Sequence, residues 1–207
     1  MVQKTERKWC SVCIEGHHRL GLPQKSLVTC SGLIPPRYSS ASLEDLPEAL
    51  VAKYAALPDD MGLMLWGPAG TGKTHSMCAF ARDLWNIGWD IRRTTYEMLM
   101  LEIRDTYKPG SIKTEYDIIH PYIICGKLVI EDVGTTVSVG KQETDFSLRT
   151  FLVLLDQRLE GCRATYITSN KSIEEIRKSF DARVASRLVQ ACEVVQLSGK
   201  DRRQHAV

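Results

Sequence analysis

The chain has 207 residues, of which 43% are hydrophobic and 25% are charged, as in an ordinary folded globular protein. These proportions exclude a mostly disordered chain, a collagen-like chain and a coiled-coil rod. The net charge of +2 is too small to diagnose a nucleic-acid-binding protein, although residues 1–37 and 200–203 are rich in Lys and Arg. The length predicts one domain with a short appendage.

The lack of a recognisable targeting signal and the pattern of cysteines both indicate a cytoplasmic protein. The longest apolar runs fall far short of the roughly 20 residues that a membrane-spanning helix needs. The amino-terminal residues MVQKTERKWC lack the apolar stretch of a secretory signal. The seven cysteines are odd in number and scattered, which favours reduced thiols over a disulfide framework. We therefore expect a cytoplasmic protein with no membrane partner.

From residue 61 onward, short apolar runs alternate with stretches of helical periodicity. The expected strands are residues 61–67, 90–96, 127–134, 164–170 and 193–198. The expected helices are residues 73–87, 97–107, 148–159 and 181–190, with a further helix opened by a capping box at Ser172 and Glu175. This alternation predicts an α/β fold in which a five-stranded parallel sheet lies between two helical layers.

The expected organisation has three parts. Residues 61–207 form the α/β core. Residues 38–60 form a linker with a short helix near residues 46–57, and residues 1–37 form a small amino-terminal appendage. Prolines punctuate the region before residue 60, and its apolar periodicity is weak.

The most specific motif is GPAGTGKT, which fits the phosphate-loop pattern G-x-x-x-x-G-K-[ST] between an expected strand and an expected helix. Its glycines let successive backbone N–H groups converge on a polyphosphate. Lys73 would add a positive charge at the β- and γ-phosphates, and the Thr74 hydroxyl would ligate Mg²⁺. The alternative is a glycine-rich turn without a ligand. The expected ATP-contacting residues are Gly67, Pro68, Ala69, Gly70, Thr71, Gly72, Lys73, Thr74 and His75.

Two acids follow the apolar run of the third expected strand. Glu131 and Asp132 are costly at the end of a buried strand unless they meet cations. Beside the phosphate loop, one would hold Mg²⁺ together with Thr74, and the other would orient the attacking water. Asn170 ends the next expected strand, where its amide would reach the same water or the γ-phosphate. The alternatives are solvated acids at a strand end and a polar turn.

The segments GPAGTGKTH, LVIEDVG, TYITSN and FDARVASRL occur in this order, behind SGLIPPRYSSASLEDL. Together they resemble an AAA+ ATPase, most closely the bacterial helicase loaders of the DnaC/DnaI type and the related IstB transposition helper. The resemblance implies a three-layer P-loop NTPase core. It also implies self-association into a ring or spiral, with the nucleotide between neighbouring subunits. No convincing helical lid follows Gly199 in this sequence, so we expect the carboxy-terminal lid to be reduced or absent.

The resemblance implies a role for each matching residue. Glu131 stands where the family usually has its metal-associated Asp, and Asp132 stands where an acid polarises water. The Glu131 side chain is one methylene longer than the usual Asp. The metal geometry and the hydrolysis rate can therefore differ from those of the family. Asn170 matches the first sensor, and Arg187 matches the arginine finger, with Arg183 one turn before it. No residue matches the second sensor of the family, for which Arg202 or Arg203 could substitute.

A second metal site is expected near the amino terminus. Cys10 and Cys13 form a C-x₂-C pair, and His17 and Cys30 follow it at a distance. These four side chains would supply the tetrahedral ligands of Zn²⁺. The alternative is a set of reduced thiols in a flexible arm. The resemblance adds that helicase loaders can carry a small zinc-bearing region that contacts the helicase.

The motifs predict a Mg²⁺-dependent ATPase, and the resemblance implies that it loads a replicative helicase onto single-stranded DNA. One alternative is an IstB-like helper that delivers a transposase to target DNA. Another is an adaptor that binds ATP but hydrolyses it negligibly, which the order Glu131–Asp132 keeps open. A small-molecule kinase is less favoured, because nothing in the sequence suggests a substrate lid.

Overall fold

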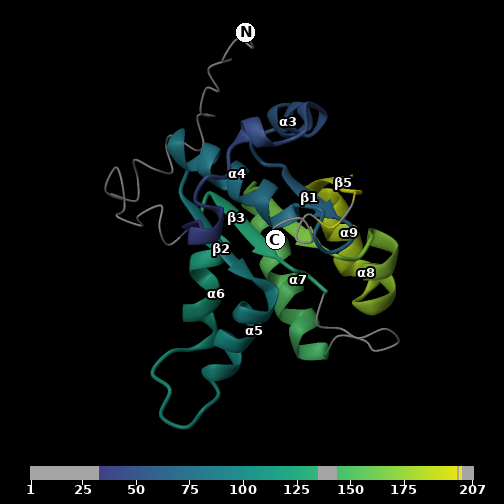
Figure 1. Cartoon of the computed structure of the whole chain (residues 1–207). Helices are drawn as coiled ribbons and strands as arrows, with labels where there is room; N and C mark the ends of the chain where they lie inside the picture. Colours follow the sequence, from purple (N-terminus) through teal and green to yellow (C-terminus); the bar gives the residue numbers. More distant parts are fainter. Residues whose placement is uncertain (1–32, 135–143, 200, 202–207) are drawn as a thin grey trace.

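The computed structural model describes residues 33–134, 144–199 and 201. The five strands form one sheet in the order β2-β3-β4-β1-β5, in which every neighbouring pair is parallel (Figure 1). They are β1 (Gly62–Trp66), β2 (Ile91–Thr95), β3 (Lys127–Glu131), β4 (Thr165–Ser169) and β5 (Cys192–Gln196). The predicted α/β fold with a five-stranded parallel sheet is confirmed.

Helices cover both faces of the sheet (Figure 1). They are α3 (Glu48–Ala55), α4 (Lys73–Asn86), α5 (Tyr96–Asp105), α6 (Glu115–Ile124), α7 (Asp145–Glu160), α8 (Ile173–Ser179) and α9 (Ala182–Ala191), with short 3-10 turns η1 (Pro36–Tyr38) and η2 (Leu43–Asp45). None of these described helices is both long enough and apolar enough to cross a membrane.

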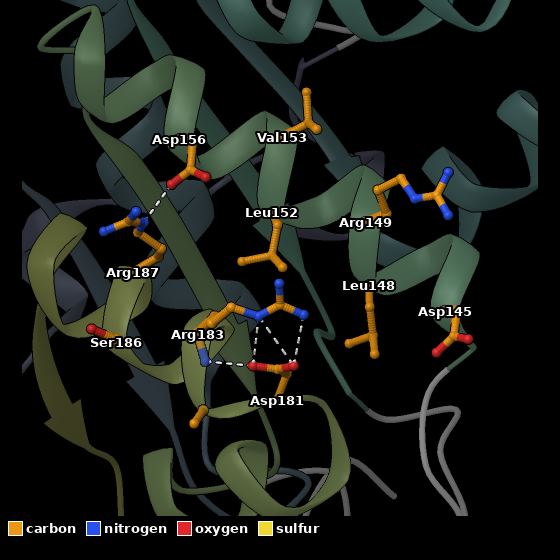
Figure 2. A pocket seen from close by; sticks show the side chains of 11 residues that line it. Asp145, Leu148, Arg149, Leu152, Val153, Asp156, Asp181, Arg183, Ser186 and Arg187 are labelled. Carbon is orange, nitrogen blue, oxygen red and sulfur yellow. Dashed lines mark hydrogen bonds and ion pairs between the residues drawn. The ribbon is translucent and has the colours of Figure 1, made fainter.

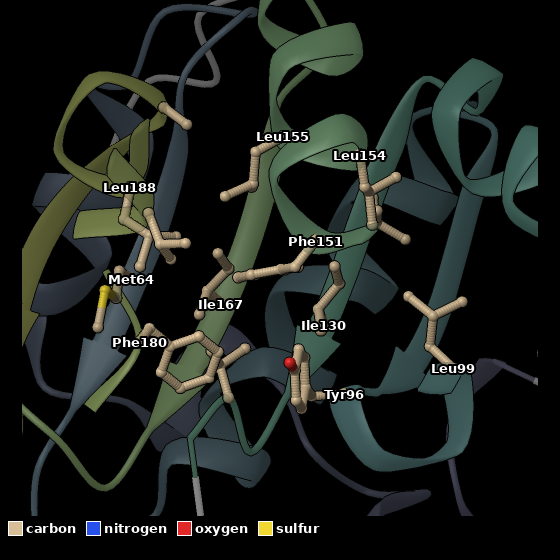
Figure 3. Close-up of a cluster of buried hydrophobic side chains, with 14 of the residues drawn as sticks. Met64, Tyr96, Leu99, Ile130, Phe151, Leu154, Leu155, Ile167, Phe180 and Leu188 are labelled. Atoms are coloured by element: carbon tan, nitrogen blue, oxygen red, sulfur yellow. The ribbon is translucent and has the colours of Figure 1, made fainter. Parts of the chain in front are cut away.

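Alternation along the strands divides the core into two clusters. Met64, Ile130 and Ile167 face one side, where they pack with side chains of α5, α7 and α9 (Figure 3). Leu65 and Val129 face the other side and pack against α3 and α4. Because successive strand residues point to opposite faces, continuous apolar strands bury both sides of the sheet. This arrangement is the expected three-layer architecture.

The segment before the first strand packs on the body of the protein. Leu33, Ile34 and Ala41 are buried in the same cluster as the residues of α4. Farther along, the Tyr54 ring of α3 stacks on Phe80 of α4 with ring centroids 4.3 Å apart. The short helix predicted near residues 46–57 is therefore present as α3 and is anchored on α4.

One helix was not predicted. The sequence pattern predicts no helix or strand between residues 110 and 126, but α6 spans Glu115–Ile124. Pro121 lies inside this helix and cannot donate the backbone hydrogen bond that a helix interior normally requires. A capping box between Thr114 and Asp117 opens the helix. The helical capping box predicted at Ser172 and Glu175 is confirmed at the start of α8.

Candidate nucleotide-binding site

The phosphate loop joins β1 to α4 at the carboxyl edge of the sheet. Gly67, Gly70 and Gly72 have φ angles of 147°, 80° and 95°, which side chains rarely adopt, so the glycines allow the tight curl of the loop. Lys73 begins α4 and is buried, with 6% of its surface exposed. Its Nζ donates hydrogen bonds of 2.7 Å to the carbonyl oxygens of Gly67 and Pro68. The loop therefore holds the ammonium group where a polyphosphate would lie.

An acid lies beside this loop on the neighbouring part of the sheet. Glu131 is the last residue of β3 and only 2% of its surface is exposed. Burial raises the pKa of its carboxyl, while hydrogen bonds from Arg93 and Thr74 act in the opposite direction. The Glu131 carboxyl is thus close to the Thr74 hydroxyl. A hydroxyl and a carboxylate are oxygen ligands that suit Mg²⁺, so the residues present fit this ion.

Asp132 and Asn170 lie at the same edge of the sheet. Asp132 is exposed and has a φ angle of 58°, and its backbone N–H donates to Thr168 Oγ1 at 2.9 Å. Asn170 is exposed and directly follows Ser169, whose carbonyl oxygen accepts a 3.2 Å hydrogen bond from the Gly67 backbone. These two hydrogen bonds connect the ends of β3 and β4 to each other and to the phosphate loop.

His75 turns toward the segment that precedes the core. Its Nε2 lies 3.4 Å from Asp45 Oδ2, and its ring meets the Tyr38 ring edge-on with centroids 6.4 Å apart. The sequence analysis places His75 among the nucleotide contacts. In the structure, its side chain contacts residues of the predicted linker.

Arg183 and Arg187 lie apart from the phosphate loop, in a cleft of about 700 Å³ between α7 and α9 (Figure 2). None of the described phosphate-loop residues lines this cleft. Its walls are formed by Asp145, Leu148, Arg149, Leu152, Val153, Asp156, Asp181, Ala182, Arg183, Ser186 and Arg187. The two arginines are one helical turn apart and share a face of α9.

Each of these arginines is paired with an aspartate of its own chain (Figure 2). Arg183 binds both oxygens of Asp181, with Nε at 3.1 and 3.3 Å and Nη2 at 3.0 Å. Arg187 uses Nε to bind Asp156 and Nη1 to contact Gln190 at 3.3 Å. Within the described residues, Arg187 Nη2 makes no hydrogen bond. Asp156 and Gln190 therefore orient the Arg187 guanidinium through Nε and Nη1 and leave Nη2 unused within the described residues.

Two further residues at the site, Arg93 and Asp201, were not predicted from the sequence. Arg93 Nε donates a 2.9 Å hydrogen bond to Glu131, and the Asp201 carboxylate lies against Gly70 of the phosphate loop. An arginine inside an otherwise strand-like run was the available signal for Arg93. No local pattern marks Asp201, because its contact is with a residue far away in the sequence.

Two sets of predicted residues lie outside the described residues. They are the zinc ligands Cys10, Cys13, His17 and Cys30, and the second-sensor candidates Arg202 and Arg203. In the part of the chain that the structure describes, no three His, Cys, Asp or Glu side chains form a group able to hold a metal ion.

A phosphate loop at the carboxyl edge of a parallel sheet, with a buried acid beside it, defines a P-loop nucleotide-binding protein. The chain belongs to the family of IstB-like ATP-binding proteins, whose sequence profile matches residues 40–206. This membership confirms the resemblance to the IstB and helicase-loader group.

Two curated relatives are replication proteins. The chain is 30% identical over 129 residues to the chromosomal replication initiator protein DnaA of Limosilactobacillus fermentum, covering 61% of this chain and 27% of DnaA. It is 25% identical over 122 residues to the replicative helicase loader DnaC of Escherichia coli K12, covering 59% of this chain and 47% of DnaC. The matched regions thus span about half of DnaC and about a quarter of DnaA.

Solved structures share the fold. The crystal structure of DnaI superposes with a TM-score of 0.66 at 19% identity, covering 84% of this chain and 98% of that structure. The crystal structure of the DnaC helicase loader superposes with a TM-score of 0.66 at 17% identity, covering 79% of this chain and 99% of that structure. At these identities the likeness establishes the P-loop fold.

Proposed function

We propose that the chain is a Mg²⁺-dependent ATPase that loads a replicative DNA helicase onto single-stranded DNA in the cytoplasm. The observation that carries the ATPase part is the convergence of Lys73, Thr74 and Glu131 at one edge of the sheet. The names of the relatives support the loader part, because DnaC is a replicative helicase loader.

Different residues of the chain bind the triphosphate, hold the metal ion and orient the attacking water. The loop N–H groups and Lys73 bind the triphosphate, and Lys73 exchanges its two carbonyl partners for phosphate oxygens. Thr74, Glu131 and Asp132 would hold Mg²⁺, which would supply positive charge against the triphosphate. Asp132 and Asn170, both exposed at the edge of the sheet, orient the attacking water.

The arginine finger acts between subunits in this proposal. Arg187 lines a cleft to which no described phosphate-loop residue contributes, and its Nη2 has no hydrogen-bond partner among the described residues. In a head-to-tail ring or spiral, the α7–α9 face of one subunit would meet the nucleotide of the next. Asp156 then orients the guanidinium through Nε, and Arg183 is the second cation of the face.

A transposition helper is the second candidate, because the matching family is named for IstB. Both functions use the same ATPase core and differ in the protein that is delivered. Affinity capture on the immobilised full-length chain, with purified replicative helicase and purified transposase from the same source, separates them. Nucleotide-dependent capture of the helicase alone supports the loader, whereas capture of the transposase alone contradicts it.

An adaptor with negligible hydrolysis is the third candidate. Its support is the longer Glu131 side chain and the commitment of one Glu131 oxygen to Arg93. Phosphate release with and without single-stranded DNA decides between adaptor and ATPase. Release that depends on Lys73 supports the ATPase, and ATP binding without release supports the adaptor.

We further propose that residues 1–37 form the partner-binding element and bind Zn²⁺ through Cys10, Cys13, His17 and Cys30. Metal analysis of the purified chain should give about one zinc per chain, and the Cys10→Ser and Cys13→Ser variants should lose it. Full zinc content in both variants would contradict this ligand set. The same samples show whether zinc loss also abolishes capture of the partner.

A further inference from the structure

The chain that follows β5 approaches the phosphate loop at two points. At the first, the Leu197 backbone N–H donates a 2.7 Å hydrogen bond to the Trp66 carbonyl oxygen. The Leu197 carbonyl oxygen lies so close to Gly67 that a side-chain carbon there would be 2.0 Å away. Leu197 is therefore pinned to the end of β1, where the phosphate loop begins.

At the second point, an acidic side chain reaches the middle of the loop. A side-chain carbon placed on Gly70 would lie 1.8 Å from Asp201 Oδ1 and 2.1 Å from its carboxyl carbon. The carboxylate thus occupies the space that a glycine leaves open. The backbone between the two contacts includes Gly199, which has a φ angle of 144°.

The negative charge of the Asp201 carboxylate is the property that affects nucleotide binding. The phosphate loop concentrates backbone N–H groups, the amino end of α4 and the Lys73 ammonium around one small volume. This positive potential attracts any anion. A carboxylate beside Gly70 and a triphosphate bound by the same loop would repel each other, because both are negative and little water separates them.

We propose that Asp201 is an internal anion that competes with the polyphosphate for the phosphate loop, so that nucleotide binding displaces its carboxylate from Gly70. The proposal rests on the proposed nucleotide site and names a way in which that site is regulated. Because the Leu197 hydrogen bond holds the preceding backbone on β1, the displacement begins beyond residue 197. Nucleotide occupancy is thereby coupled to the position of the chain that follows β5.

The test measures nucleotide affinity directly. A fluorescent ATP analogue is titrated into the full-length wild-type chain and into Asp201→Asn, which keeps the shape of the side chain and removes its charge. The Asp105→Asn variant is the matched control, because Asp105 is an exposed acid paired with Lys108 far from the loop in sequence. Lys73→Ala is the control for binding at the loop.

Asp201→Asn should bind the analogue roughly three- to tenfold more tightly than the wild type, as expected when a competing state is removed. Most of the gain in affinity should appear in the association rate, because displacement of the Asp201 carboxylate no longer has to precede binding. The control Asp105→Asn should bind with wild-type affinity.

Other results overturn the proposal in distinguishable ways. If the wild type binds in a Lys73-dependent manner and Asp201→Asn binds equally or more weakly, the Asp201 proposal is wrong and the nucleotide site stands. If neither protein binds the analogue better than Lys73→Ala, both proposals are wrong. Thermal unfolding of each variant without nucleotide verifies that the compared proteins are folded.

Discussion

Arg93 on β2 donates a 2.9 Å hydrogen bond from Nε to Oε1 of Glu131 on β3. The Glu131 side chain is 3% exposed and the Arg93 side chain 16%. A carboxylate this deeply buried is stable as an anion only with a charged or hydrogen-bonded partner. Arg93 therefore opposes the effect of burial on the Glu131 carboxyl and fixes one of its oxygens, while Thr74 lies near the same carboxyl group.

Arg93→Met should destabilise the protein and weaken Mg²⁺-dependent nucleotide binding. Breaking a buried ion pair by removing one partner leaves an uncompensated charge, which costs about 3 kcal/mol. Chemical denaturation measures the stability, and nucleotide titrations with and without Mg²⁺ measure the binding. Arg92→Met is the matched control, because Arg92 is exposed on the same strand. Equal losses in both variants would contradict a specific role for Arg93.

The pH dependence of stability follows from the buried acid. Burial raises the pKa of the Glu131 carboxyl above its ordinary value, against the opposing effects of Arg93 and Thr74. The folded protein then holds this proton more tightly than the unfolded chain does. The stabilisation is complete below the ordinary pKa and is lost as pH rises through the raised pKa.

Relative to Glu131→Gln, which does not titrate, the wild type should therefore lose unfolding free energy from about pH 4 toward neutrality. The measurement is chemical denaturation of both proteins across this range, without metal or nucleotide. A difference in unfolding free energy that stays constant with pH, or that changes in the opposite sense, would show that Glu131 does not carry the raised pKa.

Arg158 stabilises the fold away from the candidate site. It is 0% exposed. Its guanidinium donates to the backbone oxygens of Tyr122, Ile123, Cys125 and Ala164 and to Thr165 Oγ1. It thereby ties α7 to the end of α6 and the start of β4. Removing the donors would leave these buried acceptors unsatisfied.

Arg158→Met should lower the unfolding free energy by roughly 3–5 kcal/mol. The control Arg149→Met changes an exposed residue of the same helix and should have a small effect. Thermal or chemical unfolding measures both. If the two variants are equally stable, the Arg158 network contributes nothing specific to the fold.

The sequence predicts the local features well because they depend on nearby residues. The apolar runs that become β1, β3 and β4, the phosphate loop and the capping box at Ser172 all have signatures within a few positions. In α6, by contrast, Pro121 and weak periodicity obscure a helix that tertiary packing supports, since Ile119 is buried in the core.

The contacts that tune the candidate site are long-range. Arg93 and Glu131 are 38 positions apart and meet because β2 and β3 are neighbours in the sheet. Arg187 and Asp156 meet because α9 packs on α7, 31 positions away. A single sequence contains no pattern for such pairs, so sequence analysis finds the chemical groups but not their counter-ions.

In the proposed assembly, one subunit binds ATP and the next supplies Arg187. Lys73→Ala should lack nucleotide binding, and Arg187→Ala should bind normally but lose hydrolysis by on the order of 10³-fold. The decisive measurement is ATP hydrolysis by an equimolar mixture of the two variants. In a mixed assembly, about one interface in four pairs an intact loop with an intact Arg187, so about a quarter of the wild-type activity should return. A mixture of Lys73→Ala with the double variant should stay inactive. If mixing restores nothing, or if Arg187→Ala alone hydrolyses ATP at the wild-type rate, the account is contradicted.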